Sequence, residues 1–387
     1  MSQSAHPHTF FATCARGLEH ALADELVTLG AMTLKPTDAG VAFQGDMALA
    51  MRANLESRIA SRVLWQIASG SYASEQDLYL AAHRLPWSQW MQVTQTFKVD
   101  TRANRCPLKS LDFVTLRVKD AVCDHFRESC QQRPSVDTRA PQVRIHVFLD
   151  EKTYILYLDT SGEALFRRGS RVESGDAPLK KNLAAGILRL SGWHPGLPLL
   201  DPFCGAGTFL LEAAEITLNR PPGANRRFGF EQLSGWDLST WAGIKTSAQA
   251  RTLPASAMPI WGYDLKGDAL QSAHANLAAA GLEHCVTLKQ VNVLESSPPA
   301  PEGLLVTNPP YGVRMGEQEA LAALYPALGN ALKQRFAGWT AYFFTSDMRL
   351  PQLLRLKASR RTPLFNGALE CRLFEIKVVS GSNRKPR

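Results

Sequence analysis

The chain has 387 residues, of which 45% are hydrophobic and 20% are charged, and its formal net charge is +8. This composition is close to that of average globular proteins and favours a folded chain, and no stretch stays apolar for the roughly 20 residues that a membrane-spanning helix needs. Because the first eight residues also lack the layout of a signal peptide, we expect a cytoplasmic protein of two or three domains.

The charge is divided unevenly along the chain. Residues 1–165 contain 17 basic and 18 acidic side chains, a net charge of −1, whereas residues 166–387 contain 26 and 17, a net charge of +9. Such an excess is typical of a surface that binds nucleic acid, and a surface that charge merely keeps solvated is an equally good interpretation. The seven cysteines form no Cys-x-x-Cys pair, so we expect neither a disulfide framework nor a metal site.

Short strands alternate with amphipathic helices before residue 160. Apolar runs predict strands at residues 9–13, 40–43, 62–67, 96–99, 143–148 and 153–158, and helical periodicity predicts helices at 17–29, 46–58, 75–85 and 110–130. The last two strands flank Asp150-Glu151-Lys152 and are expected to form a hairpin. We interpret this half as two α+β domains, residues 1–65 and 66–160, followed by a linker at 161–180.

The order of elements changes in the C-terminal domain, residues 181–387. Strands are predicted at residues 198–201, 260–263, 286–290, 304–307 and 341–345, and helices at 207–218, 267–280, 318–336 and 351–358. Such alternation implies a parallel sheet covered on both faces. Asn366-Gly367 between two apolar runs predicts a closing hairpin, which adds an antiparallel strand. Residues from about 220 to 258 interrupt the pattern and are interpreted as an insertion.

A glycine-rich loop follows the first of these strands. The sequence Asp201-Pro202-Phe203-Cys204-Gly205-Ala206-Gly207-Thr208 leads directly into a predicted helix. Glycines at this point permit a tight turn and close approach of a nucleotide, because open α/β sheets bind ligands at the carboxyl ends of their strands. Taken alone, the pattern also fits a simple turn. Leu210 replaces the third glycine of the dinucleotide fingerprint, and there is no P-loop lysine.

Two further polar residues follow neighbouring strands. Asp264 directly follows the strand at 260–263. A carboxylate at this point can bind both hydroxyls of a ribose or cap the next helix. Asn292 follows the strand at 286–290. It can accept the adenine amine of a cofactor through its side-chain oxygen, or it can be an ordinary loop residue, and the sequence leaves both interpretations open.

The most specific motif is Asn308-Pro309-Pro310-Tyr311, directly after the apolar strand at 304–307. The prolines fix the backbone and remove two N–H donors, so that the oxygens of Asn308 and Pro309 can accept hydrogen bonds from an exocyclic amine of a base. Tyr311 can stack on the same base. This arrangement predicts methyl transfer to an amine, with guanine N2, adenine N6 and cytosine N4 all compatible.

The order of these three motifs resembles that of enzymes that methylate exocyclic amines of nucleic-acid bases. Residues 158–169, 177–185 and 226–231 resemble one subfamily more closely, the THUMP-domain 23S rRNA guanine-N2 methyltransferases of the RlmL type. The resemblance covers nearly the whole chain. It implies a ferredoxin-like domain, a THUMP RNA-binding domain and a Rossmann-like methyltransferase domain. Some members carry a second methyltransferase domain, which a chain ending at Arg387 is expected to lack.

The resemblance also implies roles for individual residues, with S-adenosylmethionine as the cofactor and a guanine of 23S rRNA, free or in a large-subunit precursor, as the substrate. The target base is expected at Asn308, Pro309, Pro310 and Tyr311. The cofactor is expected at Asp201, Phe203, Gly205, Gly207, Thr208 and Asp264, and also at Asn292, where the family commonly has an acidic residue.

Seven basic residues are candidates for contacts with RNA phosphates, and a flexible charged connector is the alternative for the last three. They are Lys98, Arg102, Arg105, Lys109, Arg167, Arg168 and Arg171. Other functions remain open at this point: a tRNA guanine-N2 methyltransferase, a DNA adenine-N6 methyltransferase, and an RNA-binding ribosome-assembly factor without catalytic activity.

Overall fold

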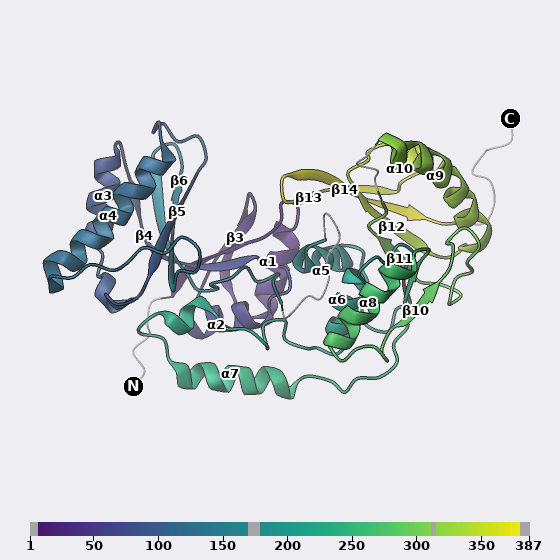
Figure 1. Cartoon of the computed structure of the whole chain (residues 1–387), viewed down its shortest axis with the longest axis horizontal. Helices are drawn as coiled ribbons and strands as arrows, with labels where there is room; N and C mark the ends of the chain where they lie inside the picture. Colours follow the sequence, from purple (N-terminus) through teal and green to yellow (C-terminus); the bar gives the residue numbers. More distant parts are fainter. Residues whose placement is uncertain (1–6, 169–178, 311–314, 380–387) are drawn as a thin grey trace. The chain divides into compact units, whose positions relative to one another are not determined.

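The computed structural model describes residues 7–168, 179–310 and 315–379, with side chains throughout these ranges except for residues 315–322 (Figure 1). The chain divides into two compact units. The first unit comprises residues 1–14, 23–167 and 223–247, and the second comprises residues 15–22, 168–222 and 248–387. No helix within the described residues is both long enough and apolar enough to cross a membrane.

The first unit is built on one seven-stranded sheet with the strand order β2-β3-β1-β4-β7-β6-β5. All pairs are antiparallel except β5 with β6, and β6 and β7 form the predicted hairpin. Its elements are β1 (His8–Thr13), α1 (Glu19–Thr28, which the unit boundary divides), β2 (Met32–Thr37), β3 (Gly40–Gly45), α2 (Met47–Glu56), β4 (Arg62–Ser71), α3 (Glu75–His83), η1 (Trp87–Gln89), β5 (Phe97–Ala103), α4 (Leu111–Cys130), β6 (Val143–Leu149) and β7 (Thr153–Asp159).

Strand β4 joins the two α+β halves, because it pairs with β1 on one side and β7 on the other. The boundary expected at residue 65 therefore falls inside a strand. Local capping fixes the helices around the sheet: Asp46 accepts the amide of Leu49 at 2.6 Å to begin α2, and Ser110 accepts that of Phe113 at 3.1 Å to begin α4. The short β2 was not predicted, because its side chains are mostly exposed and lack an apolar alternation.

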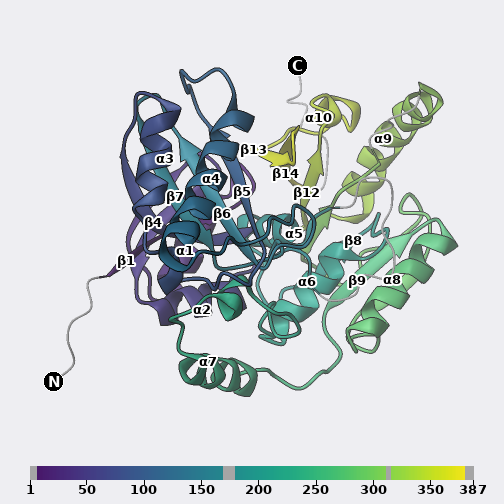
Figure 2. The same ribbon diagram turned by 60° about the vertical axis from the view of Figure 1, so that its left-hand side comes forward.

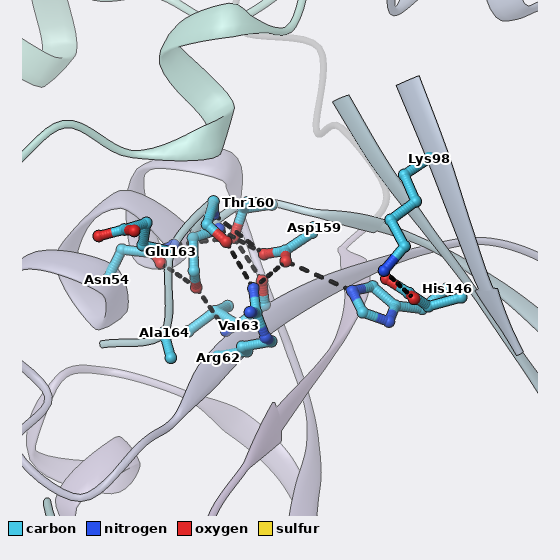
Figure 3. Close-up of polar contacts among 12 residues, drawn as sticks. Asn54, Arg62, Val63, Lys98, His146, Asp159, Thr160, Glu163 and Ala164 are labelled. Carbon is cyan, nitrogen blue, oxygen red and sulfur yellow. Dashed lines mark hydrogen bonds and ion pairs between the residues drawn. The ribbon is translucent and has the colours of Figure 1, made fainter. Parts of the chain in front are cut away.

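A buried polar cluster at the end of β7 ties the halves together (Figure 3). The Asp159 carboxylate is paired with Arg62, lies 3.3 Å from His146 Nε2 and accepts the Ser161 amide at 2.8 Å. Burial alone would raise the pKa of Asp159, but these partners hold it below its usual value. Asn54 of α2 contributes a hydrogen bond to Thr160 at 2.8 Å. The cluster thus fixes α2, β4, β6 and β7 to one another.

Most of the expected insertion belongs to the first unit. The amide of Phe230 donates to the carbonyl of Thr160 at 2.9 Å, and the Trp236 ring meets Trp65 edge-on at 6.3 Å between centroids. The segment contains η2 (Gly229–Gln232) and most of α7 (Leu238–Ala250), a helix that the sequence pattern did not predict. Aromatic packing between residues distant in the sequence therefore assigns this segment to the first unit.

The second unit contains another seven-stranded sheet, with the order β10-β9-β8-β11-β12-β14-β13. Five strands are parallel, and the terminal hairpin of β13 and β14 is antiparallel, which confirms the predicted Rossmann-like fold class. Its elements are α5 (Lys181–Leu190), β8 (Leu199–Asp201), α6 (Thr208–Thr217), β9 (Ile260–Asp264), α8 (Gly267–Ala279), β10 (Thr287–Gln290), β11 (Leu304–Thr307), α9 (Met315–Arg335), β12 (Thr340–Thr345), α10 (Leu350–Leu353), β13 (Arg360–Asn366) and β14 (Leu369–Lys377).

Both faces of this sheet are covered. Leu305 and Phe343 belong to a core that includes Tyr325 of α9, whereas their neighbours Val306 and Phe344 point to the opposite face and are equally buried. Helices α6 and α8 lie next to one another beside β8 and β9 (Figure 2). Helix α10 is only four residues long, shorter than predicted, and α5 was not predicted at all.

Candidate cofactor and target-base site

The sheet of the second unit brings the predicted motifs to one edge. Strand β8 lies between β9 and β11, and all three are parallel, so their carboxyl ends face the same way. The chain runs from β8 outward to β9 and β10 and then returns to β11 on the other side. Such a reversal of strand order is where open α/β sheets bind ligands.

The glycine loop after β8 has a backbone that only glycine adopts readily. Gly205 has φ of +52° and would place an added Cβ in open space, and Gly207 has φ of +76° where it begins α6 before Thr208. The Gly205 amide donates to Asp264 Oδ2 at 3.0 Å, while Asp264 Oδ1 accepts the amide of Lys266 at 3.0 Å. Asp264 therefore fixes the glycine loop against the end of β9.

Asp201 is a buried carboxylate, 2% exposed, at the end of β8. Its Oδ1 accepts the hydroxyl of Thr307 at 2.7 Å and the amide of Phe203 at 3.2 Å. Burial, with a smaller contribution from the charge of Asp264, raises the pKa of Asp201 to about 7. Asp201 thus shapes the loop from inside the domain, and Phe203 packs against the core beside it.

The proline loop after β11 contains an acceptor without a donor. Asn308 Oδ1 is buried and has no hydrogen-bond partner among the described residues. Such orphaned acceptors are rare in folded proteins and cost about 1–3 kcal/mol, so this oxygen is suited to a donor on a ligand. Pro309 is buried, and the carbonyl of Pro310 accepts the hydroxyl of Tyr325 at 2.5 Å. Tyr311, the predicted stacking residue, lies outside the described residues.

Asn292 serves the local turn after β10. Its side-chain oxygen accepts the amide of Leu294 at 3.0 Å, and its Nδ2 lies 3.5 Å from Glu295 Oε1. A carbonyl oxygen has two lone pairs, so a second donor can still bind there. The contacts account for an asparagine at this position without a ligand, and its role toward the cofactor adenine stays a prediction.

The basic residues divide by exposure. Arg102, Arg105 and Lys109 are exposed, whereas Lys98 is half-buried and paired with Asp100 at 2.6 Å (Figure 3). Arg167 is exposed, with Glu163 at 3.6 Å. Arg171 lies outside the described residues.

The prediction for Arg168 is wrong. Its side chain is 4% exposed, and its Nη1 lies 2.7 Å from both carboxylate oxygens of Glu212, which is itself fully buried on α6. The guanidinium is therefore neutralised inside the second unit and is not available to a phosphate. A run of arginines in the sequence does not distinguish a surface charge from a buried ion pair.

Three residues of this region were missed by the sequence interpretation: Thr307, Tyr325 and Glu212. Thr307 immediately precedes the proline motif, and its position at the end of a fully buried strand was the available signal. Tyr325 and Glu212 lie inside helices with ordinary apolar patterns. Only the tertiary structure relates them to Pro310 and Arg168.

The parallel sheet with its antiparallel hairpin, the glycine loop held by Asp264 and the proline loop at the same edge define a Rossmann-like methyltransferase. Residues 168–375 match the family described as RMKL-like, methyltransferase domain. Residues 72–159 match the THUMP domain, and residues 9–64 match the RlmL ferredoxin-like domain. The chain belongs to this THUMP-containing, RlmL-like methyltransferase family, as the motifs had indicated.

Relatives are similar along the whole chain. The protein slr0064 of Synechocystis sp. is 40% identical over 97% of this chain and 98% of its own length. The ribosomal RNA large subunit methyltransferase K/L of Syntrophotalea carbinolica is 42% identical over 96% of this chain but only 54% of its own length. The chain thus spans about half the length of its K/L relatives.

A solved structure supports the assignment of the cofactor. SMU.472, crystallised in complex with SAH (S-adenosylhomocysteine), superposes with a TM-score of 0.88 at 28% identity over 98% of this chain and 100% of that one. SAH is the product that S-adenosylmethionine leaves after methyl transfer. The open, left-handed Gly205 and the adjacent Asp264 carboxylate suit such a nucleoside ligand. The chain is therefore an S-adenosylmethionine-dependent methyltransferase.

Proposed function

We propose that this enzyme transfers a methyl group from S-adenosylmethionine to the exocyclic N2 amine of a guanine in 23S rRNA. The observation that carries the proposal is the buried, unpartnered Asn308 Oδ1 at the carboxyl edge of the sheet. The choice of RNA is supported by the THUMP domain, by the provisional name of slr0064 as an RNA methyltransferase, and by the names of the K/L relatives.

In this proposal the proline loop binds and orients the target amine. Asn308 Oδ1 and the carbonyl of Pro309 each accept one N–H, which makes the amine more pyramidal and turns its lone pair toward the methyl donor. Tyr311 stacks on the base and orients its plane. The cofactor supplies a methyl group activated by its sulfonium. Since the methylated amine is acidic, its proton passes to solvent without a strong general base, and the protein acts mainly by positioning.

The cofactor is proposed to lie on the neighbouring loops. Asp264 would accept hydrogen bonds from the ribose while it holds Gly205, and Gly207 and Thr208 would lie against the amino-acid end at the start of α6. Asp201 and Phe203 would support this end from the buried side of the loop. Asn292 would meet the adenine through its remaining acceptor capacity.

RNA is proposed to contact the first unit through its exposed basic residues. Arg102 on β5 and the following Arg105 and Lys109 form no ion pair with any other residue that the structure describes, whereas Lys98 is already paired with Asp100. Arg167 is a further exposed candidate. If the target guanine is stacked in a helix, it must be extruded to reach Asn308, since a stacked amine is not accessible to the donor.

Two rival substrates share this chemistry. A tRNA guanine N2 or a DNA adenine N6 presents the same pair of N–H groups, so the geometry of Asn308 does not separate them. An RNA-binding assembly factor without activity would have no use for a buried acceptor at the end of β11. The K/L relatives favour ribosomal RNA over the other acceptors.

The test is transfer of labelled methyl from S-adenosylmethionine to unmodified 23S rRNA, unmodified tRNA and DNA, followed by nucleoside analysis. The proposal predicts N2-methylguanosine in 23S rRNA, lost in Asn308→Ala. Label in tRNA or as N6-methyladenine would retain the mechanism and replace the substrate. Cofactor binding without label in any acceptor, including a large-subunit precursor particle, would contradict the proposal.

A further inference from the structure

Two buried hydroxyl groups, those of Thr307 and Tyr325, form hydrogen bonds on either side of Asn308, the residue proposed to bind the target base. Thr307 precedes Asn308 and Pro310 follows it by two residues, and each of these neighbours is held by one side-chain hydrogen bond. Asn308 Oδ1 itself has no partner among the described residues. The position of this oxygen therefore depends on contacts made on either side of it in the chain.

The first contact joins the two loops of the site. Thr307 is 0% exposed at the end of β11, and its hydroxyl donates to Asp201 Oδ1 at 2.7 Å. The same oxygen accepts the amide of Phe203, at the start of the glycine loop, at 3.2 Å. One buried carboxylate oxygen thus fixes the beginning of the cofactor loop and the beginning of the target-base loop relative to each other.

The second contact joins the proline loop to α9. Tyr325 is 1% exposed in the core of the second unit, and its hydroxyl donates to the carbonyl of Pro310 at 2.5 Å. Burial and the nearby charge of Asp347 both raise the pKa of Tyr325. The hydroxyl therefore stays protonated at neutral pH and always presents a donor to this carbonyl.

The prolines alone do not fix Asn308. A proline ring sets φ near −65°, but ψ of residues 308, 309 and 310 can still change. Hydrogen bonds at residues 307 and 310 close the segment at both ends, and so limit those rotations. In methyl transfer an error of about 1 Å in the position of a reacting group can cost on the order of 10²-fold in rate.

We propose that Thr307 and Tyr325 are positioning residues, which hold Asn308 Oδ1 where it can accept the exocyclic amine during methyl transfer. The proposal rests on the proposed function only in requiring that the methyl group is transferred to an exocyclic amine. It does not depend on whether that amine belongs to rRNA, tRNA or DNA. Neither residue is expected to touch the substrate. Their effect should therefore appear in the rate of transfer more than in the affinity for either ligand.

The test compares Thr307→Val and Tyr325→Phe, which remove one hydroxyl each and keep nearly the same shape. Single-turnover transfer at saturating S-adenosylmethionine and nucleic acid should fall by roughly 10- to 100-fold in each variant. Tyr325→Phe should leave the Kd of S-adenosylmethionine within about twofold, whereas Thr307→Val should weaken it several-fold, because Asp201 also binds the glycine loop. Thr307→Ser should restore most of the rate.

Tyr342→Phe is the matched control, since Tyr342 is a buried tyrosine on β12 that interacts with Glu375 instead of the proline loop. This control should keep the wild-type rate of transfer even where it loses as much thermal stability as Tyr325→Phe, or more. Wild-type rates in Thr307→Val and Tyr325→Phe, or the same loss in Tyr342→Phe, would overturn the proposal.

Hydrogen exchange separates this proposal from the proposed function. Amides of residues 304–308 should exchange faster in Thr307→Val and Tyr325→Phe than in the wild type or in Tyr342→Phe, with or without a nucleic-acid acceptor. If the wild type methylates no acceptor, the proposed function fails, and unchanged exchange at these amides then overturns the positioning role as well.

Discussion

The carboxyl edge of the second sheet and the basic run at Arg167-Arg168 differ in how directly the sequence reveals their structure. At the sheet edge, Asp201 and Asp264 end apolar strands and Asn308 directly follows one, and parallel pairing alone brings them together. In the basic run, Arg167 and Arg168 are adjacent in sequence, yet one is exposed and the other is buried. Strand ends have positions that topology determines, whereas the role of a charge depends on partners far away in the chain.

The largest expected effect tests the buried member of that arginine pair. Arg168→Ala removes the ion pair with the fully buried Glu212, and breaking a buried pair typically costs about 3–5 kcal/mol. Thermal or denaturant unfolding should show this loss. Arg167→Ala is the matched control, and it should change the free energy of unfolding by less than about 1 kcal/mol because its pair is exposed.

A double change sharpens the interpretation of Arg168. Replacing both partners, as Arg168→Met with Glu212→Leu, should recover much of the stability that Arg168→Ala loses, since no carboxylate then stays behind without its ion pair. Equal stability losses in Arg167→Ala and Arg168→Ala would contradict the difference in burial.

The next effect concerns cofactor affinity. Asp264→Ala removes the acceptor of the Gly205 amide and the proposed ribose contact, and hydrogen bonds to charged groups are worth about 1.5–3 kcal/mol. The Kd of S-adenosylmethionine, measured by calorimetry, should therefore rise by roughly 10- to 100-fold. Asp268→Ala, an exposed carboxylate in the first turn of α8, should leave it unchanged. Equal affinities in the two variants would argue against the role of Asp264.

Asp201 predicts a pH dependence of stability. Its pKa is about 7 in the folded protein against a reference value of 3.8, so folding takes up a proton between these values. The free energy of unfolding contributed by this group is fully present below pH 3.8 and is lost as the pH rises through about 7. Between pH 3.8 and about 7, the free energy of unfolding of the wild type should therefore fall relative to that of Asp201→Asn. Above this range the difference between the two should become constant. A pH-independent difference would contradict the raised pKa.

The smallest expected effects lie on the exposed basic residues. Arg102→Ala on edge strand β5 should reduce the slope of log K against log salt for RNA by about 0.7–0.9, the contribution of one phosphate contact, and leave the Kd of S-adenosylmethionine unchanged. Lys35→Ala, an exposed charge on the opposite edge strand β2, is the matched control. An identical slope in both variants would contradict the proposal that β5 contacts RNA.

Most of the second sheet could be predicted from the sequence, because buried parallel strands produce apolar runs between helical patterns. The motif residues Asp264 and Asn308 were found in the same way, since each stands where such a run ends. Elements that lack a clear apolar run or helical pattern were not predicted. Strand β2 is largely exposed, and α7 lies in a segment whose position depends on aromatic contacts such as that of Trp236 with Trp65.

The supporting residues of the site were harder to predict for a related reason. Thr307 and Tyr325 act through hydrogen bonds to Asp201 and Pro310, which lie 106 and 15 residues away in the chain. Their residue types are ordinary for a strand end and a buried helix. No local pattern distinguishes a threonine that holds a catalytic loop from one that merely packs.

The most direct test of this account is a comparison of cofactor binding and methyl transfer in one preparation of Asn308→Ala. Asn308 Oδ1 is assigned to the target amine and not to the cofactor, so the Kd of S-adenosylmethionine should stay within about twofold of the wild type. Transfer should fall by roughly 10²- to 10³-fold, the usual cost of removing one preorganised hydrogen-bonding group from a transition state. Transfer at the wild-type rate, or a loss fully explained by weaker cofactor binding, would contradict the account.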